Sequence, residues 1–174
     1  TTLFRSSQIG REHMKRKHYY RFPIGWVRIE EDEDGYITRL CVEQEKQPQK
    51  YGAAMDMLDE ETPLMLKARE QLMEYFSGWR KSFDLPIKPE GTDFQKRVWA
   101  ELVKIPYGET RSYKQVAESM GSPRSSRAIG GANNKNPIMI LIPCHRVVGA
   151  DGSLTGFAAG VEVKKQLLDL EQRN

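Results

Sequence analysis

A cysteine and a histidine stand side by side at Cys144 and His145, after Pro143 and the unbroken apolar run 138–142. Such a run predicts a short buried extended segment. Pro143 lacks an N–H and fixes φ, so the chain must turn where the thiol appears. A thiol held at the end of a rigid segment, beside an imidazole, is suited to act as a nucleophile with its base. From these residues alone, a buried structural cysteine next to an unrelated histidine is an equal alternative.

The chain has only two cysteines, Cys41 and Cys144, and three histidines, His13, His18 and His145. Cys41 lies in an alternating strand pattern and is interpreted as a small core residue. No C-x-x-C is present and no second Cys/His pair has metal-ligand spacing, so neither a metal site nor a cofactor is expected. The low cysteine count and the lack of a long apolar stretch predict a soluble, intracellular protein without a disulfide framework.

Charge is unevenly distributed, although the formal net charge is only +3. Residues 1–90 carry 15 Lys/Arg and 16 Asp/Glu, whereas residues 91–174 carry 12 and 8. Seven basic residues and two acidic ones lie within residues 104–146. The basic ones are Lys104, Arg111, Lys114, Arg124, Arg127, Lys135 and Arg146. This concentration fits a phosphate-facing surface, while a solvated basic face is the commoner cause.

The first half of the chain has the pattern of a strand-rich domain. Residues 20–29 and 36–42 have strand character, and the acidic, Gly-ended turn 30–35 between them predicts a hairpin. Pro63 suits the first position of a helix that Gly78 ends. Its predicted apolar face consists of Leu64, Leu66, Leu72, Met73 and Phe76.

Three segments are expected along the chain. Residues 1–13 are predicted to be a leader outside the fold, because a natural start at Met14 would follow them. Residues 14–90 are expected to form the N-terminal domain and a Pro- and Gly-rich linker. Residues 91–174 are expected to form the second domain.

The second half is predicted to be helical with short loops. Thr92 and Gln95 have the spacing of a capping box, and a buried stripe follows in the same helix at Phe94, Val98, Leu102 and Ile105. Ser112 can cap the next helix, and a short turn leads to another over residues 124–132. Two short helices with basic side chains predict a helix-turn-helix.

The second helix of that pair has little side-chain bulk apart from Arg127. Its small residues are Ser125, Ser126, Ala128, Gly130, Gly131 and Ala132. The two glycines cost the helix about 1 kcal/mol each. Close packing on another helix would explain them. So would insertion into a DNA minor groove, which is only about 6 Å wide and excludes bulk.

From Thr92 to Glu171 the sequence resembles the alkylguanine-DNA alkyltransferases, also called methylated-DNA–protein-cysteine methyltransferases. The matching elements are Ile105-Pro106-Tyr107-Gly108-x-Thr110-x-Ser112-Tyr113, Arg127-Ala128-Ile129-Gly130-Gly131-Ala132, Asn136-Pro137, Ile142-Pro143-Cys144-His145-Arg146-Val147-Val148, Gly156-Phe157 and Lys164-x-x-Leu167-Leu168. The first 90 residues match mainly in layout. The resemblance implies an α/β protein with a ribonuclease H-like, strand-rich N-terminal domain and a mainly helical C-terminal domain bearing the helix-turn-helix.

The resemblance also implies a direct repair reaction. The protein would bind double-stranded DNA, rotate a 6-O-alkylated guanine out of the stack and transfer the alkyl group to Cys144. Base extrusion suits this chemistry, because a thiolate cannot reach an atom inside the duplex. Each molecule would act once, without a cofactor, and a monomer is expected.

Five residues are expected to be catalytic, Cys144, His145, Glu171, Tyr113 and Asn136, and the first three of them form a proton relay. Only a few per cent of a thiol with a pKa of about 8.5 is ionised at pH 7, so Cys144 needs a base. The resemblance implies that His145 acts as this base through a bridging water, and that Glu171 orients the His145 ring. Glu171 is four residues after Leu167 and three after Leu168, which places a carboxylate on an apolar helix face, where it costs energy unless paired. A fraying C-terminal glutamate is the alternative.

Further roles follow from the resemblance alone. Tyr113 would help rotate the nucleotide and hydrogen-bond the guanine ring, Arg127 would fill the gap left by the base, and Asn136 would brace the turn before the active site. The expected DNA-binding residues are Tyr113, Ser125, Ser126, Arg127, Ala128 and Gly130, and the expected substrate pocket is Met139, Val147, Phe157 and Ala158. Phe157 and Ala158 stand where some members have tyrosine and serine, and Met139 where some have proline.

Two other functions are consistent with parts of this sequence. The first is a DNA-lesion binder without catalysis, but the related alkyltransferase-like proteins have tryptophan in place of the cysteine, so Cys144 argues against it. The second is a cysteine hydrolase using Cys144 and His145, which leaves the helix of Arg127 unexplained.

Overall fold

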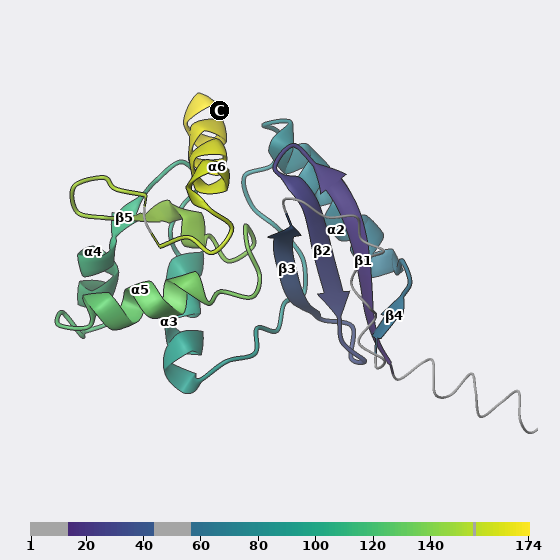
Figure 1. The fold of residues 1–174 in the computed structure, drawn as a ribbon, viewed down its shortest axis with the longest axis horizontal. Helices are drawn as coiled ribbons and strands as arrows, with labels where there is room; N and C mark the ends of the chain where they lie inside the picture. Colours follow the sequence, from purple (N-terminus) through teal and green to yellow (C-terminus); the bar gives the residue numbers. More distant parts are fainter. Residues whose placement is uncertain (1–13, 44–56, 155) are drawn as a thin grey trace, which may run out of the picture.

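The computed structural model describes residues 14–43, 57–154 and 156–174. They form two parts that lie side by side (Figure 1): a sheet with one helix from the first half of the chain, and a mainly helical part from the second. The predicted leader 1–13 lies outside the described residues. No helix in the described ranges is long and apolar enough to cross a membrane.

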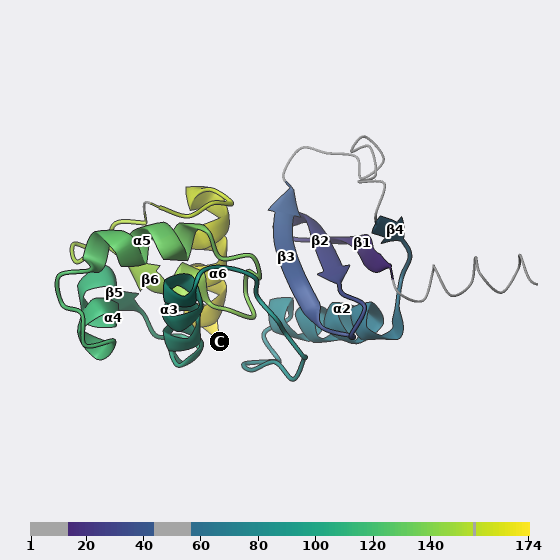
Figure 2. The same ribbon diagram turned by 90° about the horizontal axis from the view of Figure 1, so that it is seen from below.

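The N-terminal sheet has four strands in the order β3-β2-β1-β4. β1 (Lys15–Phe22), β2 (Gly25–Glu31) and β3 (Ile37–Glu43) form an antiparallel meander, and β4 (Met57–Asp59) pairs in parallel with β1. Helix α2 (Pro63–Phe76) runs along one face of the sheet (Figure 2). Fully buried apolar side chains of both layers include Val27, Ile29, Ile37, Leu40, Met65, Ala68 and Leu72.

The sheet contains two hairpins where the sequence predicted one. The acidic turn between β2 and β3 is confirmed: the Asp32 carboxylate accepts two backbone N–H groups within it, and Gly35 adopts a φ of 82°. The prediction of a single strand over residues 20–29 is wrong. The chain turns there at Pro23, which has no N–H for a strand ladder, and at Gly25, whose φ is 122°.

Helix α2 begins and ends as predicted, but its buried face agrees only in part with the prediction: Leu72 is buried, and Leu64 and Phe76 pack against the core. The Thr62 side chain caps its N-terminus, and Gly78 follows its end with a φ of 82°. Leu66 and Met73, predicted to be on the buried face, are 45% and 51% exposed. The face that packs inward consists of Met65, Ala68, Gln71, Leu72 and Tyr75. Leu66 and Met73 each follow a buried residue, Met65 and Leu72, by one position, which turns their side chains about 100° away from the buried face.

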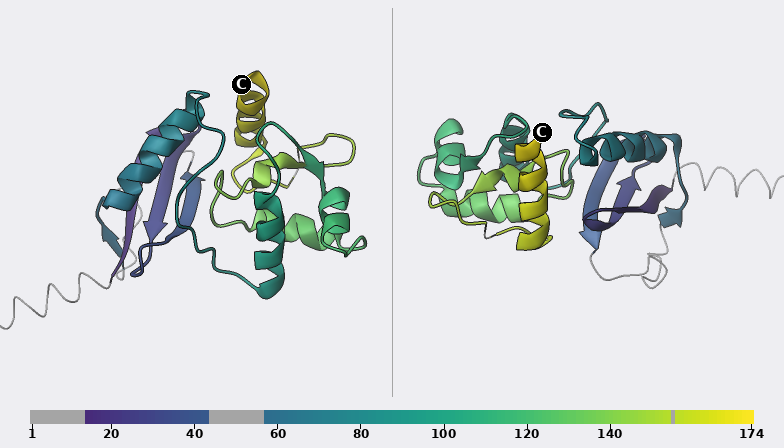
Figure 3. Two further views of the ribbon diagram at one scale, coloured as in Figure 1. Left: turned by 180° about the vertical axis from the view of Figure 1, so that it is seen from behind. Right: turned by 90° about the horizontal axis from the view of Figure 1, so that it is seen from above.

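The C-terminal part holds four α-helices and one small sheet (Figure 3). The elements are α3 (Asp93–Val103), β5 (Arg111–Ser112), α4 (Tyr113–Ser119), α5 (Ser126–Asn134), the 3₁₀ helix η2 (Cys144–Arg146), β6 (Val147–Val148) and α6 (Val161–Arg173). The predicted capping box at Thr92 is present, and Ser112 forms a second one. Helices α4 and α5 contact each other across a short turn, which confirms the predicted helix-turn-helix arrangement.

β3 is the edge strand on one side of the sheet, and two segments of the chain pair with it and cover that edge. Ile37 exchanges two backbone hydrogen bonds of 2.9 Å with the linker at residues 86–88. Leu40 exchanges two more of 2.9 Å with residues 137–139, in the loop that leads to Cys144. An uncovered edge strand would expose unpaired N–H and C=O groups. The N-terminal sheet therefore supports the loop that leads to Cys144.

Candidate active site around Cys144

The apolar run 138–142, predicted to be extended, is a tight loop instead. Ile140 has a φ of 70°, which is rare for a β-branched residue, and the N–H of the following residue reaches back across it at 2.8 Å. Pro143 adopts φ −79° and ψ 63°, the angles of an inverse γ-turn, and the Cys144 N–H donates to the Ile142 carbonyl at 2.8 Å. The prediction was wrong because the second half of the run bonds back to its first half: Leu141 N–H donates to the Met139 carbonyl, and Ile142 N–H donates to the Ile138 carbonyl.

Asn136 braces this loop with its side-chain amide. Its Nδ2 donates to the Ile142 carbonyl at 2.8 Å, and its Oδ1 accepts the Ile138 N–H at 3.0 Å. These bonds join the end of α5 to the residues directly before the cysteine. Asn136 thus makes the contact that the resemblance implied for it.

Cys144 opens the single turn of η2 and is only 2% exposed. Burial raises the pKa of its thiol to about 11, while a hydrogen bond from Asn136 and the charge of Lys164 act to lower it. The thiol is therefore protonated at neutral pH in the free protein. Chemistry at this sulfur requires a neighbouring group that takes the proton.

His145 is fully buried, and its ring is oriented by a carboxylate. Nε2 lies 2.5 Å from Glu171 Oε2. An ionised carboxylate can only accept, so Nε2 carries a hydrogen and Nδ1 of the neutral ring has a free lone pair. Nδ1 has no hydrogen-bond partner in the described part of the chain. Burial lowers the pKa of His145, although the bond to Glu171 acts to raise it. The ring is thus a neutral base.

Glu171 is the centre of a buried hydrogen-bond network. Its carboxylate accepts from His145, from Arg146 Nε at 2.8 Å and Nη2 at 3.2 Å, from the Tyr75 hydroxyl at 2.6 Å, and from the Gly108 N–H at 3.1 Å. Burial would raise the pKa of Glu171, but these bonds hold it well below its usual range. The predicted pairing of Glu171 with His145 is present, and the carboxylate is ionised.

Two buried cations near this network were missed from the sequence. Arg146 was counted with the basic surface, which is wrong: it is 6% exposed and also donates to the Ile105 carbonyl at 2.7 Å. Lys164 is fully buried, and its Nζ donates to the Val147 carbonyl at 2.6 Å. Lys164 is three residues before Leu167. The helical spacing that placed Glu171 on the apolar face of this helix therefore places Lys164 on that face as well.

Tyr113 lies between the second helix of the pair and the loop before α6. A Cβ at Gly130 would lie 3.8 Å from its ring, and a Cβ at Gly156 3.3 Å from its hydroxyl. Burial raises its pKa, the charge of a Cys144 thiolate would add to this, and a hydrogen bond with Asn133 opposes it. Asn133, also missed from the sequence, donates to the Cys144 carbonyl at 3.3 Å. Tyr113 and Cys144 thus face one site.

The four predicted pocket residues are only partly brought together. Lys164 links Val147 to Phe157, because its Nζ lies 5.7 Å from the Phe157 ring centroid. Ala158 is exposed beside Phe157. Met139 is buried in the loop that pairs with β3 and belongs to the same hydrophobic core cluster as Val147 and Phe157.

Helix α5 presents an open, small-residue surface. Arg127 and Ala128 are exposed, and a Cβ at Gly131 would meet nothing within 4 Å. Gly131 therefore does not serve close packing against another described element. Ser125 and Ser126, at the start of the helix, are half-buried.

Two family models together match nearly the whole chain. The DNA-binding domain of 6-O-methylguanine DNA methyltransferase matches residues 93–173, and the ribonuclease-like domain of the same enzyme matches residues 15–89. The chain belongs to the 6-O-methylguanine DNA methyltransferase family. The family predicted from the cysteine motif is confirmed, and so is the strand-rich, ribonuclease-like fold of the first half.

Relatives in this methyltransferase family cover most of the chain. A methylated-DNA–protein-cysteine methyltransferase of Methanosarcina acetivorans is 46% identical over 87% of this chain and 95% of its own length. A constitutive enzyme of that name from Bacillus subtilis is 45% identical over 86% and 91%. The structure of Mycobacterium tuberculosis OGT in complex with DNA superimposes with a TM-score of 0.80, at 38% identity, over 91% of this chain and 93% of that one.

Proposed function

We propose that this protein repairs DNA by moving the methyl group from oxygen 6 of methylated guanine to Sγ of Cys144. The observation that carries the proposal is the buried series Cys144, His145 and Glu171, in which a neutral base stands next to a protonated thiol. Cys41, the other cysteine, lies in β3, and burial raises its pKa without a described histidine contact. Several relatives are named for transfer to a protein cysteine.

The reaction takes place in two linked steps at Cys144. The thiol proton passes through a water molecule to Nδ1 of His145, and Glu171 stabilises the imidazolium that forms. The thiolate then attacks the methyl carbon, a C–S bond forms, and the electrons of the broken C–O bond pass to the guanine. The guanine takes up one proton, so the net products are a thioether and normal guanine. The thioether cannot release the methyl group, so each molecule acts once.

Three other groups support the transfer, one at the departing guanine and two at the sulfur. Tyr113 donates its hydroxyl hydrogen to the ring as negative charge develops there, and its raised pKa keeps that hydroxyl protonated. Lys164 places a buried positive charge near the sulfur, which favours the thiolate once the proton has left. Asn136 holds the sulfur in place through the loop.

DNA is bound through the helix-turn-helix, with α5 against a groove. The open surface around Gly131 allows close approach of the helix, and Arg127 is its one long exposed side chain. We infer that Arg127 enters the duplex in place of the extruded guanine. Exposed Lys114, Arg124 and Lys135 contact phosphates. The site is complete within one chain, so the protein acts as a monomer on double-stranded DNA.

Intact-protein mass spectrometry tests the proposal against its alternatives. After mixing with a duplex that carries 6-O-methylguanine, the protein should gain the mass of one methylene and no more, however large the excess of duplex. An unmethylated duplex of the same sequence is the control. A protein that binds the lesion but keeps its mass would be a lesion binder, and multiple turnovers with unchanged mass would indicate a hydrolase.

A further inference from the structure

One residue of the active-site network belongs to the N-terminal domain. Tyr75 is the last residue but one of α2. Its hydroxyl donates to Glu171 Oε2 at 2.6 Å, although the two residues are 96 positions apart in the sequence. The same oxygen accepts from His145 Nε2. The N-terminal domain therefore supplies a direct hydrogen bond to the carboxylate that orients the base.

The position of the Tyr75 ring is fixed by aromatic neighbours. Its centroid lies 5.3 Å from that of Phe76, 5.5 Å from Phe83 and 6.1 Å from Tyr107, and its side chain is fully buried. Burial and the neighbouring Glu171 charge raise the pKa of Tyr75, so the hydroxyl keeps its hydrogen and remains a donor. A buried donor with a fixed ring can define where an acceptor must lie.

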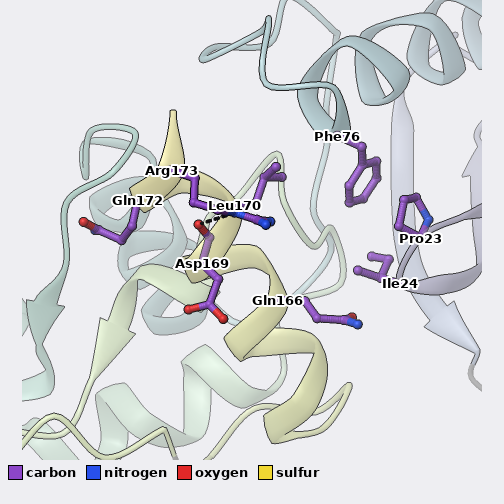
Figure 4. A pocket seen from close by; sticks show the side chains of 8 residues that line it. All are labelled: Pro23, Ile24, Phe76, Gln166, Asp169, Leu170, Gln172 and Arg173. Atoms are coloured by element: carbon purple, nitrogen blue, oxygen red, sulfur yellow. Dashed lines mark hydrogen bonds between the residues drawn. The ribbon is translucent and has the colours of Figure 1, made fainter.

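The two domains are not packed tightly beside this hydrogen bond. A cleft of about 460 Å³ opens there, lined by Ile24 and Phe76 on one side and by Gln166, Leu170 and Arg173 of α6 on the other (Figure 4). Phe76 and Leu170 are the sequence neighbours of Tyr75 and Glu171. The cleft separates α6 from the sheet here, so the two domains are not held together by packed side chains at this point. The hydrogen bond from the Tyr75 hydroxyl to the Glu171 carboxylate joins them instead.

We propose that Tyr75 is a positioning residue for methyl transfer, through which the N-terminal domain holds the Glu171 carboxylate in line with His145. The proposal rests on the proposed roles of Cys144 and His145. Removing the hydroxyl leaves Oε2 with His145 Nε2 and Arg146 Nη2 as its donors. The carboxylate then loses an orienting donor and attracts the imidazole proton more strongly. The charged groups that face His145 are otherwise unchanged: Glu171 and Lys164 from α6, and Arg146 from η2.

The test is Tyr75→Phe, with Tyr107→Phe as the matched control. The Tyr107 ring centroid lies 5.7 Å from the Arg146 guanidinium carbon. The Tyr107 hydroxyl is also buried, yet it has no hydrogen-bond partner among the described residues. Tyr75→Phe should slow methyl transfer about tenfold, as expected for losing a hydrogen bond to a charged group. The acid limb of its pH–rate profile should move to higher pH, because the pKa of His145 rises. Tyr107→Phe should change neither.

Titration of His145 by NMR in the protein without DNA gives a second readout that does not depend on repair. The chain has three histidines, so a His145→Gln sample identifies the signal. Tyr75→Phe should raise the pKa of His145 relative to wild type and to Tyr107→Phe. An unchanged His145 titration in folded Tyr75→Phe protein would overturn the proposal. If the wild-type protein took up no methyl group, the proposed function would fail, and the titration would still decide the role of Tyr75.

Discussion

In the free protein the Cys144 thiol and the His145 imidazole are both neutral, because burial disfavours the charged form of each. Glu171 supplies the negative charge that would stabilise a proton arriving on the ring. A buried neutral thiol is inert toward oxidants and metals, which suits a protein that can react only once. The reactive form arises only when the proton can move to Nδ1.

The pH dependence of transfer follows from the state of His145. The neutral ring is the base, and burial lowers its pKa from the ordinary value of about 6.5. The single-turnover rate should therefore stay level as the pH falls to about 6.5 and drop only below the lowered pKa of His145. Stopped reactions in a buffer series measure this. An acid limb centred above 6.5 would mean that the Glu171 charge, rather than burial, dominates the ring.

Replacing Glu171 with Gln should affect both catalysis and folding. Transfer should slow by about 10²–10⁴-fold, because the imidazolium loses its stabilising charge. The free energy of unfolding should also fall by about 3–5 kcal/mol, because Arg146 is left buried without its carboxylate. Rates are measured on the folded variant and stability by urea unfolding.

Glu109→Gln is the control for that substitution. Glu109 pairs with Arg111 at 3.2 Å on the surface, and its loss should change stability by less than about 1 kcal/mol. If Glu171→Gln transferred methyl groups at the wild-type rate, Glu171 would be a structural residue only.

Among the elements, the loop of residues 136–143 determines where the thiol lies. Asn136 holds it with three hydrogen bonds from one amide. Asn136→Ala should lower the free energy of unfolding by about 1–3 kcal/mol, because buried backbone groups lose their partner, and it should also slow transfer. Asn134→Ala, two residues earlier and exposed, should stay within about 0.5 kcal/mol of wild type. Equal effects of the two substitutions in urea unfolding would contradict this role.

In the proposed function, helix α5 is the element that distinguishes duplex DNA from a free base. Arg127→Ala should slow repair of methylated duplex far more than transfer from free 6-O-methylguanine, because only the duplex requires base extrusion. Arg124→Ala, three residues earlier and equally exposed, should weaken duplex binding and its salt dependence without this selectivity. Equal slowing of Arg127→Ala on both substrates would point to a defect in the active site instead.

Local signals in the sequence predicted most elements correctly. Thr92, Ser112 and Gly78 mark helix ends because capping depends on residues only a few positions apart. The run 138–142 was misassigned because its shape depends on Asn136 and on two γ-turns, which hydrophobic periodicity cannot reveal. The buried face of α2 was predicted only in part because its apolar residues extend round more than one side of the helix.

At the scale of the whole molecule, the active site uses both domains. Leu40 pairs with the loop before Cys144, and Tyr75 donates to Glu171. That Glu171 needs a partner was predictable because a carboxylate on an apolar helix face costs energy unless paired, and the resemblance to the alkyltransferases implied that the partner is His145. The contributions of Tyr75, Arg146 and Lys164 were not predicted, since their partners lie far away in the sequence or on the backbone.

Cys144, and not Cys41, is proposed to accept the methyl group. A duplex with an isotopically labelled methyl on guanine oxygen 6, followed by peptide mapping, tests it in wild type, Cys41→Ser and Cys144→Ser. The label should appear on the Cys144 peptide in wild type and in Cys41→Ser, and nowhere in Cys144→Ser, whose affinity for the duplex should be nearly unchanged. Label taken up by Cys144→Ser, at Cys41 or elsewhere, would contradict the account.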